Sequence, residues 1–149
     1  MSIAVRPAVP GDEADILRMI RALADFEREP DAVVATEAML ADNLFGAGAH
    51  VHAQIAERDG RAVGLAVWFL NYSTWTGRPG LYLEDLFVDP AARGQGIGGA
   101  LIQDLVDIGR ERGWSRLYWH TRASNDTARR LYDTFVEADD FVRYRMILD

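Results

Sequence analysis

Residues 83–113 limit most strongly what this chain can fold into. An apolar run from Leu83 to Val88 leads into a segment that has four glycines between positions 94 and 99. Apolar residues then recur at the spacing of one helical face, at Ile97, Leu101, Leu105 and Ile108. Gly113 follows as a typical helix stop. The segment therefore predicts a buried strand, a glycine-rich loop and a helix in direct succession.

This succession is a common way to hold a phosphate group. The N-terminus of a helix leaves backbone N–H groups unpaired and carries a partial positive charge. Glycines at 94 and 96 let a backbone approach an anion closely, and Arg93 adds a cation. The glycines alone are also compatible with a turn chosen only for its conformation. The segment lacks the Lys-Ser/Thr of a nucleotide-binding P-loop and does not follow the first strand, as a dinucleotide fingerprint would.

The rest of the chain alternates between short strands and helices. Alternating or apolar runs predict strands at 2–8, 51–58, 61–70, 81–88, 116–121 and 141–148. Helical spacing and capping residues predict helices that begin after Asp12, Thr36, Gly96 and Asn125. Residues 71–80 are expected to form a loop. The order of elements indicates an α/β domain with a mixed sheet.

Composition narrows the class of function. The 149 residues fit a single domain over 1–149, and the net charge of −7 argues against a nucleic-acid partner. Neither a signal peptide nor a membrane span is apparent, so we expect a cytoplasmic protein with no membrane partner. With no cysteine and three histidines, we expect no metal site. The acidic charge suits a cationic substrate, although it equally suits a need for solubility.

Arg93-x-x-Gly96-x-Gly98, placed after the strand Leu83–Val88 and Asp89-Pro90, resembles the acetyl-CoA signature of the GCN5-related N-acetyltransferase (GNAT) superfamily. The resemblance implies a GNAT-like α/β fold, with a central, mixed, mostly antiparallel twisted sheet of about six to seven strands flanked by about four helices. It also implies a single N-acetyltransferase domain over 1–149 that uses acetyl-CoA and needs no metal.

A narrower resemblance is to the diamine and spermidine/spermine N-acetyltransferase branch. It rests on 82–88, on 71–78, on Ala24-Asp25-Phe26-Glu27, and on Asn125 followed seven residues later by Tyr132. This branch implies a homodimer that acetylates a primary amine of a small cationic substrate: a polyamine, a diamine or an amino acid with a side-chain amine. The chain departs from the branch after Tyr132, where Asp-Thr-Phe replaces the usual nearby glycine.

The resemblance also assigns residues to the acetyl donor. The expected acetyl-CoA contacts are Leu86, Phe87, Val88, Arg93, Gly94, Gln95, Gly96, Ile97, Gly98, Gly99, Asn125, Asp126, Thr127, Ala128 and Tyr132. The backbone of 86–88 would pair with the pantetheine arm, 94–99 would hold the pyrophosphate, and 125–128 would flank the arm.

Two residues are candidates for the chemistry. Tyr132 would donate a proton to the departing thiolate, and its alternative is a core tyrosine with a satisfied hydroxyl group. Glu84 would accept a proton from the amine, directly or through water. The alternative for Glu84 is an ion pair with Arg143 or Arg145. Simple strand alternation places the side chains of Glu84 and Asp85 on opposite faces.

The expected substrate contacts are Phe26, Glu27, Trp75, Glu84 and Asp85. Glu27 would pair with a distal ammonium group, and Trp75 would pack on an alkyl chain or make a cation–π contact. Exposed charge on a helix end and packing at a subunit interface are the respective alternatives. Two other functions stay open: a non-catalytic sensor that binds acyl-CoA, and an acetyltransferase of protein amines.

Overall fold

The structure, a computed structural model, describes residues 2–149. Contacts divide the chain into two compact units, one that ends at Trp119 and one that spans His120–Asp149. The first unit holds the whole sheet and three of the four α-helices. The expectation of a single domain over 1–149 stays a prediction.

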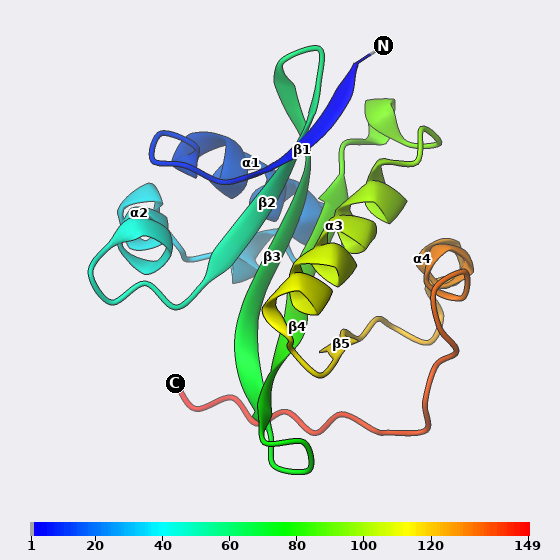
Figure 1. The fold of residues 1–149 in the computed structure, drawn as a ribbon. Coiled ribbons are helices and arrows are strands. Elements are labelled where there is room, and N and C mark those ends of the chain that lie inside the picture. Colours follow the sequence, from blue (N-terminus) through cyan, green and yellow to red (C-terminus); the bar gives the residue numbers. More distant parts are fainter. Residues whose placement is uncertain (1) are drawn as a thin grey trace. The chain divides into compact units, whose positions relative to one another are not determined.

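The first unit is built on one sheet whose strands follow the order of the chain (Figure 1). The strands are β1 (Ile3–Pro7), β2 (His52–Arg58), β3 (Arg61–Ser73), β4 (Arg78–Val88) and β5 (Leu117–Tyr118). The pairs from β1 to β4 are antiparallel, whereas β4 and β5 are parallel. The mixed, mostly antiparallel sheet is therefore confirmed. Residues 2–149 contain five strands, fewer than the six to seven expected.

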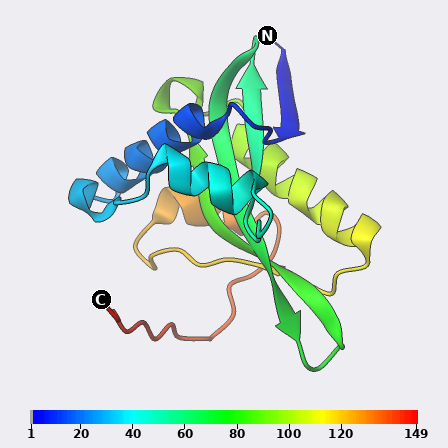
Figure 2. The same cartoon turned by 90° about the vertical axis from the view of Figure 1, so that its left-hand side faces the viewer.

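Helices cover both faces of this sheet. The α-helices are α1 (Glu13–Phe26), α2 (Glu37–Phe45), α3 (Ile97–Arg112) and, in the second unit, α4 (Asp126–Tyr132). Two short 3-10 helices, η1 (Pro30–Ala32) and η2 (Pro90–Ala92), lie in the connections. Figures 1 and 2 show α1 and α2 on one face and α3 on the other. Two caps agree with the sequence, since the Thr36 side chain accepts from the N–H of Met39 at 3.2 Å and Gly113 adopts φ +73°. The expected cap at Asp12 is wrong, because its carboxylate makes no cap hydrogen bond and instead accepts from Arg6 and from the N–H of Val9.

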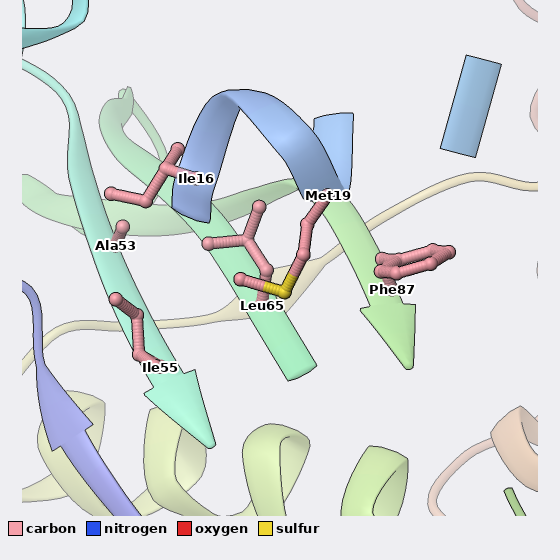
Figure 3. Close-up of a cluster of buried hydrophobic side chains, with 6 residues drawn as sticks. All are labelled: Ile16, Met19, Ala53, Ile55, Leu65 and Phe87. Carbon is pink, nitrogen blue, oxygen red and sulfur yellow. The ribbon is translucent and has the colours of Figure 1, made fainter. Parts of the chain in front are cut away.

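Two layers of apolar contact fix the sheet between its helices. On one face, Ile16 and Met19 of α1 are completely buried against strand residues (Figure 3). The strand side chains of this cluster are Ala53, Ile55, Leu65 and Phe87. Each large side chain buried in this way contributes about 1.5–3 kcal/mol. On the other face α3 packs closely, because a Cβ on Gly64 of β3 would lie 3.0 Å from Ile97.

The expected loop at 71–80 is wrong. β3 continues to Ser73 and β4 starts at Arg78, so that the two strands form a long hairpin that runs past the other strands (Figure 1). The residues at 71–80 are typical of turns, but cross-strand pairing overrides that local preference. Gly80 shows why a glycine occurs within the strand, since a Cβ there would lie 2.6 Å from Oδ1 of the opposite Asn71.

The expected last strand at 141–148 is also wrong, and the strand at 116–121 shrinks to Leu117–Tyr118. Strand assignment requires a hydrogen-bonded neighbour, and within its own unit the segment 141–148 has no strand to pair with. Its apolar side chains are exposed, for example Tyr144 at 94%. No helix within residues 2–149 is long and apolar enough to cross a membrane.

Candidate functional site

The glycine-rich loop has a backbone that only glycine adopts readily. β4 ends at Val88, η2 follows, and Gly94 and Gly96 each have φ +79°. A Cβ on either glycine would meet no other atom within 4 Å, so the space above the loop is open. Gly96 is the N-cap of α3 and supplies no side chain to cap the helix. The first-turn N–H groups of α3 are therefore suited to an anion.

The other glycines of this segment differ from Gly94 and Gly96. Gly98 and Gly99 lie in the first turn of α3 and are not among the glycines with positive φ. Ile97 is 2% exposed and belongs to the core, so only its backbone can take part in binding. The expected start of the helix at Ile97 is confirmed.

Arg93 lies beside a residue expected on the substrate side. Its guanidinium group is 5.1 Å from the centre of the Phe26 ring, and its Nε donates to the carbonyl of Val88 at 3.2 Å. Phe26 itself, the last residue of α1, is 54% exposed. The structure therefore brings the end of α1 next to the start of the glycine-rich loop.

Two further arginines contact the segment that joins β4 to α3, and the sequence analysis missed both. Arg18 of α1 donates to Asp89 at 3.2 Å and to the carbonyl of Ala62 at 3.0 Å. Arg58 of β2 donates to the carbonyl of Ala91 at 3.3 Å and to Oε1 of Gln95 at 3.4 Å. Neither arginine lies in a motif, so no local signal in the sequence points to these contacts.

The edge of β4 next to the loop is free of strand pairing on one side. β4 pairs with β3 as far as Val88, whereas its pairing with β5 covers only Leu81 and Tyr82. No described strand pairs with Leu86 or Val88 on the β5 side. Both of these residues are half-buried, and Phe87 between them is in the core. An extended chain could add to this edge through backbone hydrogen bonds.

A β-bulge interrupts β4 at Glu84. Val67 of β3 pairs with Asp85 and Trp68 pairs with Leu83, which leaves Glu84 as the extra residue. The expectation that Glu84 and Asp85 point to opposite faces is therefore not supported, because regular alternation does not hold across a bulge. Glu84 is exposed and Asp85 is half-buried.

Three carboxyl groups gather near this bulge. Burial, followed by the negative charges of Glu84 and Glu27, raises the pKa of Asp85 to about 6. Glu27 comes from the C-cap of α1, whose last turn contains no basic residue. An anion at a helix C-terminus is unfavourable, as is a cluster of like charges. We call Glu27, Glu84 and Asp85 the acidic cluster; it joins three of the expected substrate residues in one place.

Trp75 does not belong to this arrangement in the structure. It lies at the tip of the β3–β4 hairpin and is 97% exposed. Its ring stacks on no other described aromatic ring. Its expected role toward the substrate stays a prediction.

The second unit holds the remaining expected residues. Asn125 caps α4, since its Oδ1 accepts from the N–H of Ala128 at 3.2 Å. Thr127 Oγ1 accepts from Arg130 at 3.4 Å, and Asp126 lies in the first turn, where a negative charge is favourable. Tyr132 is the half-buried last residue of α4. The expected helix and its cap are confirmed, whereas the roles of these side chains stay predictions.

Comparison with known proteins identifies the family. The sequence profile of the acetyltransferase (GNAT) family matches residues 16–135. The chain belongs to this family. It is 36% identical to a thialysine N-epsilon-acetyltransferase of Sus scrofa over 146 residues, which cover 93% of this chain and 85% of that protein. The expected GNAT resemblance is thus confirmed, and the chain is an N-acetyltransferase.

Two further comparisons extend this result. The acetyltransferase is 37% identical to the human spermidine/spermine N(1)-acetyltransferase-like protein 1 over 70% of its own length and 16% of that protein, which matches the expected branch. Its fold matches the crystal structure of an aminoglycoside acetyltransferase from a soil metagenome with a TM-score of 0.85. That match has 18% identity and covers 99% and 97% of the two chains.

Within residues 2–149 the structure shows no group of three or more histidine, aspartate or glutamate side chains placed to hold a metal ion.

Proposed function

We propose that this enzyme transfers an acetyl group from acetyl-CoA to a primary amine of a small cationic substrate. The substrate class comprises polyamines, diamines and amino acids with a side-chain amine, and both substrates are bound at once. The observation that carries the proposal is the acidic cluster, which accumulates negative charge at the end of α1 and at the bulge of β4. Such a cluster costs stability unless a cation occupies it. The related thialysine N-epsilon-acetyltransferase of Sus scrofa and the human spermidine/spermine N(1)-acetyltransferase-like protein 1 support the same class.

The donor side fits the phosphates of acetyl-CoA. The space next to the backbone of Gly94 and Gly96 is empty, so an anion can approach it. No side chain caps the first turn of α3, which leaves its N–H groups available to the anion. When bound, acetyl-CoA would supply the acetyl thioester. Backbone groups of 86–88 would pair with its pantetheine arm, because that edge of β4 has no described strand partner. Residues 93–99 would bind the pyrophosphate.

The acidic cluster would bind and activate the acceptor. A primary ammonium has a pKa near 10 and must lose a proton before it attacks. Glu84, exposed at the bulge, would take that proton directly or through water. Glu27 would pair with a distal ammonium group, and Phe26 would pack on the alkyl chain. A bound cation would lower the raised pKa of Asp85 by supplying the missing opposite charge.

Residues of the second unit would complete the chemistry. Tyr132 would give its hydroxyl proton to the departing thiolate sulfur. Residues 125–128 would flank the pantetheine arm. Both assignments rest on the seven-residue spacing of Asn125 and Tyr132 that the sequence shares with the family. The proposal further includes a single catalytic domain over 1–149, a homodimer and a cytoplasmic location.

A kinetic panel tests the proposal. Thiol release from acetyl-CoA is measured with spermidine, putrescine, lysine, thialysine, a lysine-containing peptide and a hydroxylated monoamine that carries no second cation. We expect turnover with at least one substrate that carries a second cation and a much lower kcat/KM for the monoamine. Binding of acetyl-CoA without turnover across the panel would favour a sensor instead. Turnover only with peptide amines would favour an enzyme that modifies proteins.

A further inference from the structure

Positive charge concentrates at the glycine-rich loop although the chain as a whole is acidic. The net charge is −7, yet three arginines from different parts of the first unit contact residues 88–95. They are Arg18 of α1, Arg58 of β2 and Arg93 of the loop itself. Such a concentration favours an anion at this one place.

The three arginines differ in how much charge they leave free. Arg18 forms ion pairs with Asp15 at 3.6 Å and with Asp89 at 3.2 Å, so its charge is largely neutralised. Arg58 and Arg93 form no ion pair with any carboxylate of residues 2–149. Arg93 is expected from the motif, whereas Arg58 comes from a distant strand.

Arg58 is also placed to order the loop. It is half-buried at the end of β2, and its Nη1 donates to the carbonyl of Ala91 and to Oε1 of Gln95. These two contacts lie on either side of Arg93 and Gly94 in sequence. The side chain therefore connects the end of the β2–β3 hairpin to both ends of the segment that precedes α3.

We propose that Arg58 is a positioning residue for the acetyl donor. It holds the loop through Ala91 and Gln95 and gives the phosphate end of the donor a positive charge that no described carboxylate neutralises. This inference rests on the proposed use of acetyl-CoA. Arg58 would thus take part in donor binding although it lies outside the Arg93-x-x-Gly96-x-Gly98 motif.

The test compares two acetyl donors in wild type, Arg58→Gln and Arg58→Lys. Acetyl-CoA carries the phosphates, and acetyl-pantetheine has the same thioester without them. We expect Arg58→Gln to raise KM for acetyl-CoA about five- to tenfold at low salt with little change in kcat, because a charge-assisted contact is lost. The effect should shrink as salt screens the charge. Arg58→Lys should recover part of the affinity, since it keeps the charge but not the planar guanidinium group.

Arg61→Gln is the matched control, because Arg61 pairs with Arg58 across the hairpin, and among the described residues no hydrogen bond or ion pair joins its side chain to residues 88–95. It should leave KM for acetyl-CoA unchanged. Equal losses with acetyl-CoA and acetyl-pantetheine in Arg58→Gln would reduce Arg58 to a general structural role and overturn the inference. An unchanged KM in Arg58→Gln would overturn it as well. Failure of wild type to use acetyl-CoA would instead overturn the proposed function.

Discussion

The donor side and the acceptor side of the proposed site are built in different ways. The donor side is mostly backbone: two glycines at φ +79°, the first turn of α3 and the open edge of β4. The acceptor side consists of side chains, several of them exposed, such as Phe26 at 54% and Trp75 at 97%. A backbone site depends on the fold and tolerates few changes. A site made from exposed side chains can change its substrate without a change of fold.

The two sides also differ in charge. Arg58 and Arg93 bring unneutralised positive charge to the donor loop, while Glu27, Glu84 and Asp85 bring negative charge to the acceptor side. This separation matches a donor that carries phosphates and an acceptor that carries ammonium groups. Contacts between Arg93 and Phe26 show that the two regions meet within the first unit.

Replacement of Tyr132 by Phe should have the largest effect on activity. It tests whether the chemical step can be lost while both the donor side and the acceptor side still bind their substrates. We expect kcat to fall about a hundredfold, because a positioned proton donor contributes about 10²–10⁴ to the rate. KM for acetyl-CoA should change little. Steady-state thiol release provides the measurement, and an unchanged kcat would remove Tyr132 as the acid.

Gly96→Val tests whether the donor side depends on its backbone. A β-branched residue at φ +79° is strained by about 1–2 kcal/mol, so acetyl-CoA affinity should fall about tenfold as the loop shifts. Gly113→Val is the matched control, since Gly113 has φ +73° at the other end of α3 and equally open surroundings. Titration calorimetry should show normal acetyl-CoA affinity in the control. Equal affinities in the two variants would contradict the assignment of the loop.

Asp85→Asn tests the electrostatic cost of the acceptor side. The pKa of Asp85 is raised to about 6, above its reference value of about 3.9, so the folded protein binds this proton more tightly than the unfolded chain does. The free energy of unfolding should therefore fall as pH rises from about 4 to 6 and lose about 1 kcal/mol between pH 5 and pH 8 from this group.

Asparagine at position 85 does not titrate, so Asp85→Asn removes this part of the pH dependence of the free energy of unfolding. Urea unfolding should show Asp85→Asn to be stabilised relative to wild type at pH 8 by more than it is at pH 5. A variant destabilised equally at both pH values would show that the carboxyl group is instead required by the native packing.

Trp75→Ala should have the smallest effect. The side chain is 97% exposed, so the free energy of unfolding should change by less than about 0.5 kcal/mol. If Trp75 contacts the amine, KM for the amine should rise about threefold while KM for acetyl-CoA stays constant. Tyr72→Ala, on the same hairpin and 60% exposed, is the control. An unchanged KM for the amine would remove Trp75 from the substrate contacts.

The sequence predicts those parts of the fold that depend on local patterns. Helix α3 and its caps follow from the spacing of apolar residues and from Gly96 and Gly113. The turn-forming residues at 71–80 predict a loop, but cross-strand pairing overrides them and extends the β3–β4 hairpin. The segment 141–148 alternates like a strand, but alternation does not supply a partner.

The same distinction between local patterns and long-range contacts applies to the site. The donor loop is contiguous in sequence, so its motif is visible there. The bulge at Glu84 is a slip of one residue in register, which alternation does not reveal. The effect of Glu27 on the pKa of Asp85 and the contacts of Arg58 with Ala91 and Gln95 join residues far apart in the chain. Contacts of this kind can be recognised only once the folded structure is known.

The most direct test of the assignment of the glycine-rich loop to the phosphates is to follow backbone amide resonances of the isotope-labelled protein during titration with acetyl-CoA and with acetyl-pantetheine. We expect acetyl-CoA to shift the amides of residues 93–99 and of 86–88, whereas acetyl-pantetheine should shift 86–88 and leave 93–99 nearly unchanged. Saturable acetyl-CoA binding that leaves the amides of 93–99 in place would contradict the assignment of the glycine-rich loop to the phosphates.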